Sequence, residues 1–225
     1  MMGFSTRDIQ ARCAALGFNP GPIDGIKGRR TSSALQEAMA SNGVSSISGL
    51  FGRDGLHRIH GHWTGGAYGA IDLELRAYNG VIDHDATRHA GRWGFQDQAM
   101  YRAGARGASH TLNANTGSIG LAVDAMAGAQ ERPFRAGSAP VTWAQVDELA
   151  KWIAELSVRF WIPITRYSVL THAEVQPTLG IRQKWKWDIT WLPDMDRPGD
   201  PVEVGDRIRA LAVDHLDRAD IKAAA

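Results

Sequence analysis

The sequence predicts an α/β fold in which a mixed central β-sheet is flanked by helices, with a small helical domain before it. Short apolar runs typical of strands alternate with amphipathic helical patterns through the middle of the chain. The 225 residues, 44% hydrophobic and 22% charged, have ordinary globular composition and suffice for one medium domain and a small satellite. The first forty-odd residues form a separate, purely helical pattern.

The N-terminal pattern predicts a compact helical domain at 1–44. A first helix begins after Ser5, whose spacing to Asp8 is that of a capping box. Turn-forming residues then fill 18–25, and Thr31 is expected to cap a second helix. The domain is therefore expected to consist of short helices joined by a tight, glycine-rich and proline-rich turn.

A linker rich in serine and glycine is predicted at 45–56, followed by the larger domain at 57–200. The clearest helix, at 142–160, has a capping box and one apolar stripe. A last amphipathic helix is expected within the C-terminal segment 201–225, which packs on the larger domain or is partly disordered. Four apolar runs suit strands, namely 58–62, 78–82, 119–123 and 167–170.

Charge and composition exclude several classes of partner. The 25 Lys and Arg balance 24 Asp and Glu, so no global field attracts nucleic acid. The single cysteine, Cys13, excludes an intrachain disulfide and a zinc site of paired thiolates. No run approaches the roughly 18 apolar residues of a membrane span, so no membrane insertion is expected. Residues 1–12 lack the apolar region of a secretory signal, so we expect synthesis in the cytoplasm without a signal peptide.

Two of the eight histidines follow apolar runs directly, where ligands from distant segments can converge. His62 and His172 each end a predicted strand, and Asp188 follows 16 residues after His172. In extended chain, Lys186 shares a face with Asp188. A catalytic metal site usually has three protein ligands. His60 is two positions before His62, so both side chains point to the same face of the strand and His60 remains a rival ligand. A structural role for any single histidine also stays open.

Four ordered segments carry a family resemblance. They are HWTGG at 62–66, AYNGVIDHD at 77–85, the run from SH to SIGL at 109–121, and LTHAEVQP at 170–177, with a Lys-Trp-Asp element at 186–188. In this order they resemble the type 2 N-acetylmuramoyl-L-alanine amidases, zinc-dependent peptidoglycan amidases related to peptidoglycan recognition proteins. The resemblance covers about residues 58–193 and implies the mixed-sheet fold of that family.

The resemblance implies a site and one zinc ion per chain. The implied zinc ligands are His62, His172 and Asp188. An aspartate in place of cysteine as third ligand is a family variant that suits zinc. The implied catalytic residues are Tyr78, near the attacking water, and Lys186, facing the scissile carbonyl. Residues 178–185 are an insertion relative to compact members and are expected to form a loop at the rim of the cleft. The substrate cleft is expected to include His110, Trp63 and Thr64.

The N-terminal segment LGFNPGPIDGIKG at 16–28 is similar to the signature of small three-helix peptidoglycan-binding domains. This resemblance implies wall binding through Pro20, Asp24 and Gly25. The alternative is a helical cap that only stabilises the enzyme.

The expected activity is hydrolysis of the amide between N-acetylmuramic acid and L-alanine by zinc-activated water. The alternatives are a recognition module that binds peptidoglycan without cutting it, and a cytoplasmic amidase that recycles muropeptides. The modular layout and the missing secretory signal favour a bacteriolytic phage endolysin. We expect it to be a monomer that reaches the cell wall through a holin-type pore.

Overall fold

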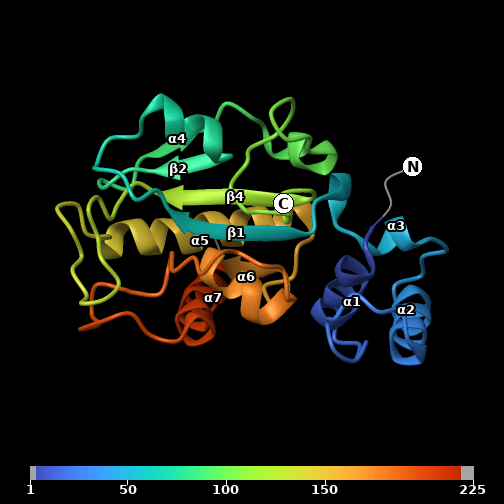
Figure 1. Cartoon of the computed structure of the whole chain (residues 1–225). Coiled ribbons are helices and arrows are strands. Elements are labelled where there is room, and N and C mark those ends of the chain that lie inside the picture. Colours follow the sequence, from blue (N-terminus) through green and yellow to red (C-terminus); the bar gives the residue numbers. More distant parts are fainter. Residues whose placement is uncertain (1–3, 219–225) are drawn as a thin grey trace.

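The computed structural model describes residues 4–218 (Figure 1). Its helices at the N-terminal end are α1 (Thr6–Ala15), α2 (Arg29–Ser41) and α3 (Ile47–Leu50), followed by the 3-10 turn η1 (Arg53–Gly55). The later elements are β1 (Arg58–Trp63), α4 (Asp72–Ala77), β2 (Gly80–Ile82), β3 (Arg88–Ala90), η2 (Phe95–Met100), β4 (Ser118–Val123), α5 (Trp143–Phe160), β5 (Val169–Thr171), α6 (His172–Leu179) and α7 (Pro201–Asp217). The end of the predicted C-terminal segment, 219–225, lies outside the described residues.

The five strands form one mixed sheet in the order β3-β2-β4-β1-β5. All neighbouring pairs are parallel except β2 and β3, which are antiparallel. Helix α5 packs against β2 and β4, whereas α6 and α7 pack against β5 (Figure 1). The predicted α/β class, with a mixed central sheet flanked by helices, is confirmed. Every residue of β1 and β4 is buried. Strand β4 is accordingly apolar after Ser118, as is typical of a parallel strand covered on both faces, whereas β1 buries Arg58, His60 and His62.

Helix α5 is held in place by a local cap and by the main core. The Thr142 hydroxyl accepts a hydrogen bond from the backbone of Gln145, whose side chain returns to Thr142, as the capping-box prediction requires. Its buried face includes Leu149, Ile153 and Phe160, which join the core beneath the sheet. Burying each such side chain contributes about 1.5–3 kcal/mol. The helix therefore fixes the sheet from one side.

The predicted capping box of α1 is confirmed, but the predicted start of α2 is wrong. Ser5 and Asp8 cap one another as expected. Helix α2, however, begins at Arg29, and its N-cap is Gly28. The buried Thr31 hydroxyl instead donates to the Pro20 carbonyl, so it secures the turn between the helices rather than capping the second one.

The N-terminal helices pack directly on the larger part of the chain. The Arg7 guanidinium donates to the Leu179 carbonyl at 2.9 Å, and Asp8 forms an ion pair with Arg58 at the start of β1. Ala11 joins an apolar cluster that includes Leu170. Segment 45–56 contains α3 and η1. The domain boundaries drawn from the sequence stay predictions.

Two elements around the expected cleft differ from the sequence prediction in ways that matter for the site. Strand β2 starts at Gly80, later than expected, because Tyr78 is the C-cap of α4. The residues after His172 form helix α6, so the predicted loop at 178–185 begins on the last turn of a helix. Among residues 4–218, no helix combines the length and the apolar character needed to cross a bilayer.

Candidate metal centre

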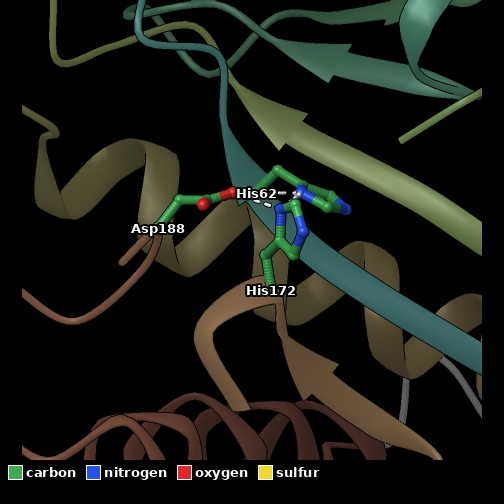
Figure 2. Close-up of side chains that lie close together, drawn as sticks. All are labelled: His62, His172 and Asp188. Atoms are coloured by element: carbon green, nitrogen blue, oxygen red, sulfur yellow. Dashed lines mark hydrogen bonds and ion pairs between the residues drawn. The ribbon is translucent and has the colours of Figure 1, made fainter. Parts of the chain in front are cut away.

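Three buried side chains meet at the end of the sheet: His62, His172 and Asp188 (Figure 2). The Nδ1 atoms of the two histidines are 3.1 Å apart. Asp188 Oδ2 lies 3.1 Å from His62 Nδ1 and 3.0 Å from His172 Nδ1. One atom from each residue therefore points at a common centre.

The sheet topology explains why these distant residues converge. His62 is near the end of β1, and His172 follows β5 directly. Because β1 and β5 are parallel neighbours, their carboxyl ends share one edge of the sheet. Asp188 is brought to this edge by a backbone hydrogen bond of 2.8 Å from Ala173 N to the Asp188 carbonyl. The start of α6 therefore holds both His172 and Asp188 in the cluster.

Burial and the contacts within the cluster together set its protonation. Burial lowers the pKa of His62 to about 4, although Asp188 opposes the shift. Burial alone would raise the pKa of Asp188, but the contacts with His172 and His62 outweigh it and hold that pKa well below its usual range. The cluster therefore offers a carboxylate and a neutral His62 imidazole.

The donor set fits a divalent transition metal, zinc in particular. Zinc takes imidazole nitrogen and carboxylate oxygen, and catalytic sites use three protein ligands with one open position. Ligand atoms at about 2.0–2.2 Å from a tetrahedral ion are about 3.3–3.6 Å apart. The donor separations of 3.0–3.1 Å are close to this spacing. Among the described residues, no other group of three such side chains comes together.

A cavity of about 420 Å³ opens beside the cluster and is called the central cavity here. Besides His172 and Asp188, its lining includes every residue that the sequence placed in the cleft or in catalysis: Tyr78, Lys186, His110, Trp63 and Thr64. The Tyr78 ring is 5.1 Å from the His62 ring. Burial, with the charges of Asp188 and Glu74, raises the pKa of the Tyr78 phenol above its usual value.

Lys186 occupies a junction between three cavities. Its exposed side chain lines the central cavity and two larger ones, of about 620 and 660 Å³. The 620 Å³ cavity, here the tryptophan cavity, is also lined by Trp185 and Trp187. The 660 Å³ cavity, here the loop cavity, is lined by Thr111 and Asn113. All three cavities therefore meet at Lys186, next to the cluster.

The rival ligand His60 does not reach the cluster. It points the same way as His62, as its parity predicts, but its Nδ1 lies 3.1 Å from Thr111 Oγ1. Its Nε2 has no hydrogen-bond partner among residues 4–218. His110 is equally buried and packs between His60 and His62, 5.6 and 5.2 Å from their rings. Burial lowers the pKa of both His60 and His110 well below the usual value.

The three residues expected to bind the cell wall lie in the turn between α1 and α2. Asp24 accepts hydrogen bonds from Gln10 at 2.9 Å and from its own turn, and the Gly25 amide donates to Gln10 at 2.9 Å. Gly25 has a φ of +82°, a conformation that favours glycine. The Pro20 carbonyl accepts from Thr31. These residues shape the turn, and their role in wall binding stays a prediction.

Sequence reasoning missed two residues that contact the outer nitrogens of the clustered histidines. Thr111 Oγ1 is 3.4 Å from His62 Nε2, and Gln183 Oε1 is 3.0 Å from His172 Nε2. Thr111 follows His110 directly, so the motif around His110 offered a signal. Gln183 lies in the inserted segment, where no motif points to it.

No protein-family model matches the chain, and no curated protein matches it. Among solved structures, the chain is similar to the N-acetylmuramoyl-L-alanine amidase LysC from Clostridium intestinale URNW. The two share 15% sequence identity with a TM-score of 0.39, and the match covers 71% of this chain and 87% of that one. The function of this chain is therefore inferred from its own residues.

Proposed function

We propose that the chain is a zinc-dependent peptidoglycan hydrolase that cleaves the amide between N-acetylmuramic acid and L-alanine. The buried cluster of His62, His172 and Asp188 carries this proposal, because it presents a complete set of zinc donors beside a cavity lined by Tyr78 and Lys186. The ordered motifs around these residues, which resemble those of type 2 amidases, support an amide of peptidoglycan as the substrate.

Each residue at the central cavity has a distinct task in this proposal. Zinc held by the three ligands would supply Lewis-acid chemistry, lowering the pKa of water to about 7 and polarising a carbonyl. The Lys186 ammonium would stabilise the negative charge that develops on the scissile carbonyl oxygen. The Tyr78 hydroxyl would orient the attacking water by a hydrogen bond.

The N-terminal helices are proposed to hold the enzyme on the cell wall. A wall-binding unit joined to a wall hydrolase is typical of an endolysin, so this role is part of the proposal. Release through a holin-type pore and a monomeric state stay predictions. Sedimentation of metal-free protein with purified cell walls tests wall binding separately from cleavage.

Metal analysis together with mass spectrometry of digested sacculi tests the activity. We expect one zinc per chain and release of stem peptides that begin with a free L-alanine amine. Zinc binding without any release would instead support a recognition module. Cleavage confined to small soluble muropeptides would support a recycling amidase.

A further inference from the structure

The outer nitrogen of each clustered histidine, the one facing away from Asp188, contacts a side chain that can fix its proton. A neutral imidazole has one N–H donor and one acceptor nitrogen. The partner of the outer nitrogen therefore decides whether the inner nitrogen, Nδ1, offers a lone pair or a proton to the centre.

Gln183 fixes His172. The Gln183 amide nitrogen donates to the Leu112 carbonyl at 2.7 Å. Since a carbonyl only accepts, this bond sets the orientation of the amide and places Oε1 against His172 Nε2, at 3.0 Å. An amide oxygen also only accepts, so His172 Nε2 carries the proton and Nδ1 keeps its lone pair.

His110 starts a second chain of hydrogen bonds. Its Nε2 lies 3.1 Å from the Ser118 carbonyl and donates to it. The Gln98 side-chain nitrogen is also 3.2 Å from His110 Nε2, but three backbone carbonyls, those of Ala108, Asn115 and Ser118, already accept its two protons. No carboxylate contact is found for His110 among residues 4–218, and an unpaired buried charge would be costly, so the ring is neutral. Its Nδ1 is therefore an acceptor and takes the hydroxyl proton of Thr111, at 2.8 Å.

Thr111 then fixes His62. A hydroxyl has one proton to donate and two lone pairs that accept. With its proton given to His110, Thr111 Oγ1 accepts from His60 Nδ1 at 3.1 Å and from His62 Nε2 at 3.4 Å. His62 Nε2 is also 3.3 Å from His110 Nδ1, but the one lone pair of that nitrogen already accepts the Thr111 proton at the shorter distance of 2.8 Å. The proton of His62 is thereby on Nε2, and its Nδ1 lone pair faces His172 Nδ1 and Asp188 Oδ2. With Nδ1 of both histidines unprotonated, these three atoms are all acceptors, an arrangement that a cation at their centre would satisfy.

Backbone hydrogen bonds and a close contact hold the segment of His110 and Thr111 in place. The Asn115 side-chain oxygen accepts from the backbone amides of His110 and Thr111, at 3.0 and 2.8 Å. A Cβ at Gly120 would lie 2.4 Å from the His110 ring, so the ring fits only because that strand residue is glycine. One short segment, His110 with Thr111 and Leu112, thus serves both histidines.

We propose that Thr111 and Gln183 are positioning residues that hold His62 and His172 with Nε2 protonated and Nδ1 open to the metal. The inference rests on the metal centre of the proposed function but not on its peptidoglycan substrate. Partners of this kind orient metal-binding imidazoles, and their loss typically weakens metal affinity 10- to 100-fold.

Zinc affinity of the full-length protein, measured by competition with a chromophoric chelator, tests the proposal. We expect Thr111→Val and Gln183→Met, which keep size and remove the hydrogen bond, each to weaken zinc binding by about 10- to 100-fold. Thr111→Ser keeps the hydroxyl and should restore the affinity. Thr178→Val, the same change in a half-buried residue of α6, is the matched control and should bind zinc as the wild type does.

Nitrogen NMR of the zinc-loaded protein supplies a readout that a general loss of packing would not reproduce. Both histidines should coordinate through Nδ1 and show slowly exchanging Nε2 protons. Thr111→Val should lose the protected proton of His62 and keep that of His172, whereas Gln183→Met should do the reverse. Wild-type affinity in both variants, or coordination through Nε2, would overturn the proposal.

The two proposals fail in different ways. If the wild type binds no zinc, the metal centre and the positioning roles fall together. If zinc binds and the variants weaken it, but sacculi are not cleaved, only the amidase activity is lost.

Discussion

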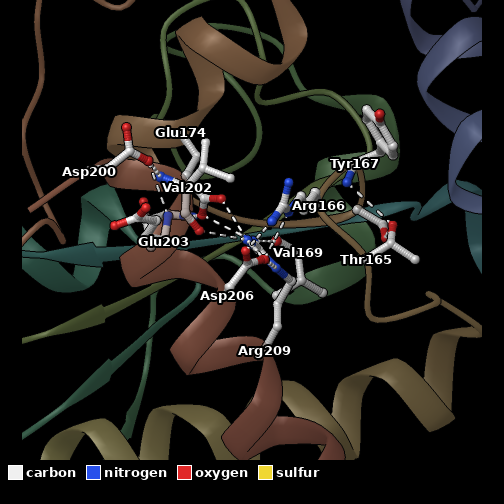
Figure 3. A network of polar contacts seen from close by, with 12 residues as sticks. Thr165, Arg166, Tyr167, Val169, Glu174, Asp200, Val202, Glu203, Asp206 and Arg209 are labelled. Atoms are coloured by element: carbon white, nitrogen blue, oxygen red, sulfur yellow. Dashed lines mark hydrogen bonds and ion pairs between the residues drawn. The ribbon is translucent and has the colours of Figure 1, made fainter.

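Arg209 in α7 and Glu174 in α6 form a buried ion pair, with Nη2 2.8 Å from Oε1 and Nη1 3.1 Å from Oε2 (Figure 3). Glu174 also accepts a hydrogen bond of 2.7 Å from the Thr171 amide, which caps α6 at the residue before His172. Burial raises the pKa of Glu174 against the opposing effect of Arg209. The C-terminal helix therefore secures the helix start that positions a metal ligand.

Replacing one member of this pair is expected to lower the stability of the fold. Arg209→Met leaves the Glu174 carboxylate buried without its partner, and breaking such a pair lowers the free energy of unfolding by about 3–5 kcal/mol. Urea denaturation measures the change. The double variant Arg209→Met with Glu174→Gln should recover part of the loss. Arg207→Met, which removes an exposed pair with Asp194, is the control and should cost at most about 1 kcal/mol.

Stability should depend on pH through Asp124, which follows β4 and is fully buried. Burial, reinforced by the negative charges of Asp83 and Glu74, raises its pKa to about 7 from 3.8. The folded state then holds this proton more tightly than the unfolded state, so Asp124 costs stability as pH rises from about 4 to 7. The loss should be complete above pH 7.

Comparison of the wild type with Asp124→Asn isolates this contribution. Asparagine does not titrate, so the variant should match the wild type near pH 4 and be increasingly favoured toward pH 8. Urea denaturation across this range measures both proteins. A difference between them that stays constant with pH would contradict the assignment.

Removing any one proposed zinc ligand should remove metal and activity together. His62→Ala, His172→Ala and Asp188→Ala each leave two donors, too few for a stable site. Zinc content after gel filtration and release of stem peptide are the measurements. His57→Ala is the control for loss of a buried histidine, since the His57 ring packs against Phe51 and lies outside the cluster. Stoichiometric zinc in the His172→Ala protein would defeat the ligand assignment.

Lys186 is expected to act on the reaction and not on the metal. Lys186→Ala should keep its zinc, because the side chain lines the cavities without belonging to the cluster. Its kcat should fall by roughly 10²–10³, the usual cost of losing one group that stabilises an oxyanion. Lys184→Ala, the neighbouring exposed lysine, serves as control. Normal turnover in the Lys186 variant would remove that residue from the mechanism.

Trp185 is expected to contribute to substrate binding. The residue is 85% exposed and lines the tryptophan cavity, whereas Trp191 is only 7% exposed and belongs to the core. We expect Trp185→Ala to raise KM for polymeric peptidoglycan several-fold with little change in kcat, because a flat apolar surface for the substrate is lost. Trp161 is also exposed and has a similar left-handed backbone, so Trp161→Ala is the matched control. Equal KM values in the two variants would contradict this role.

Structural features that depend only on residues close together in the sequence were predicted correctly. The capping boxes at Ser5 and Thr142 occur as expected, since capping needs only side chains three positions apart. Thr31 has an equally good capping pattern, yet its hydroxyl bonds to Pro20, which packing brings to it. The sequence does not predict strand β3, because two of its three residues are half-exposed, Ala90 is exposed, and they lack an apolar alternation.

The residue pattern alone predicts the fold class, the approximate positions of most strands and long helices, and, through motif order, the proposed ligands and cleft residues. Packing in three dimensions is what turns His60 to Thr111 and not to the metal centre. It also brought Gln183 to His172 and Thr111 to His62, the latter across 49 positions of the chain. Contacts over such separations depend on strand register and on helix packing, which no local pattern of residue types specifies.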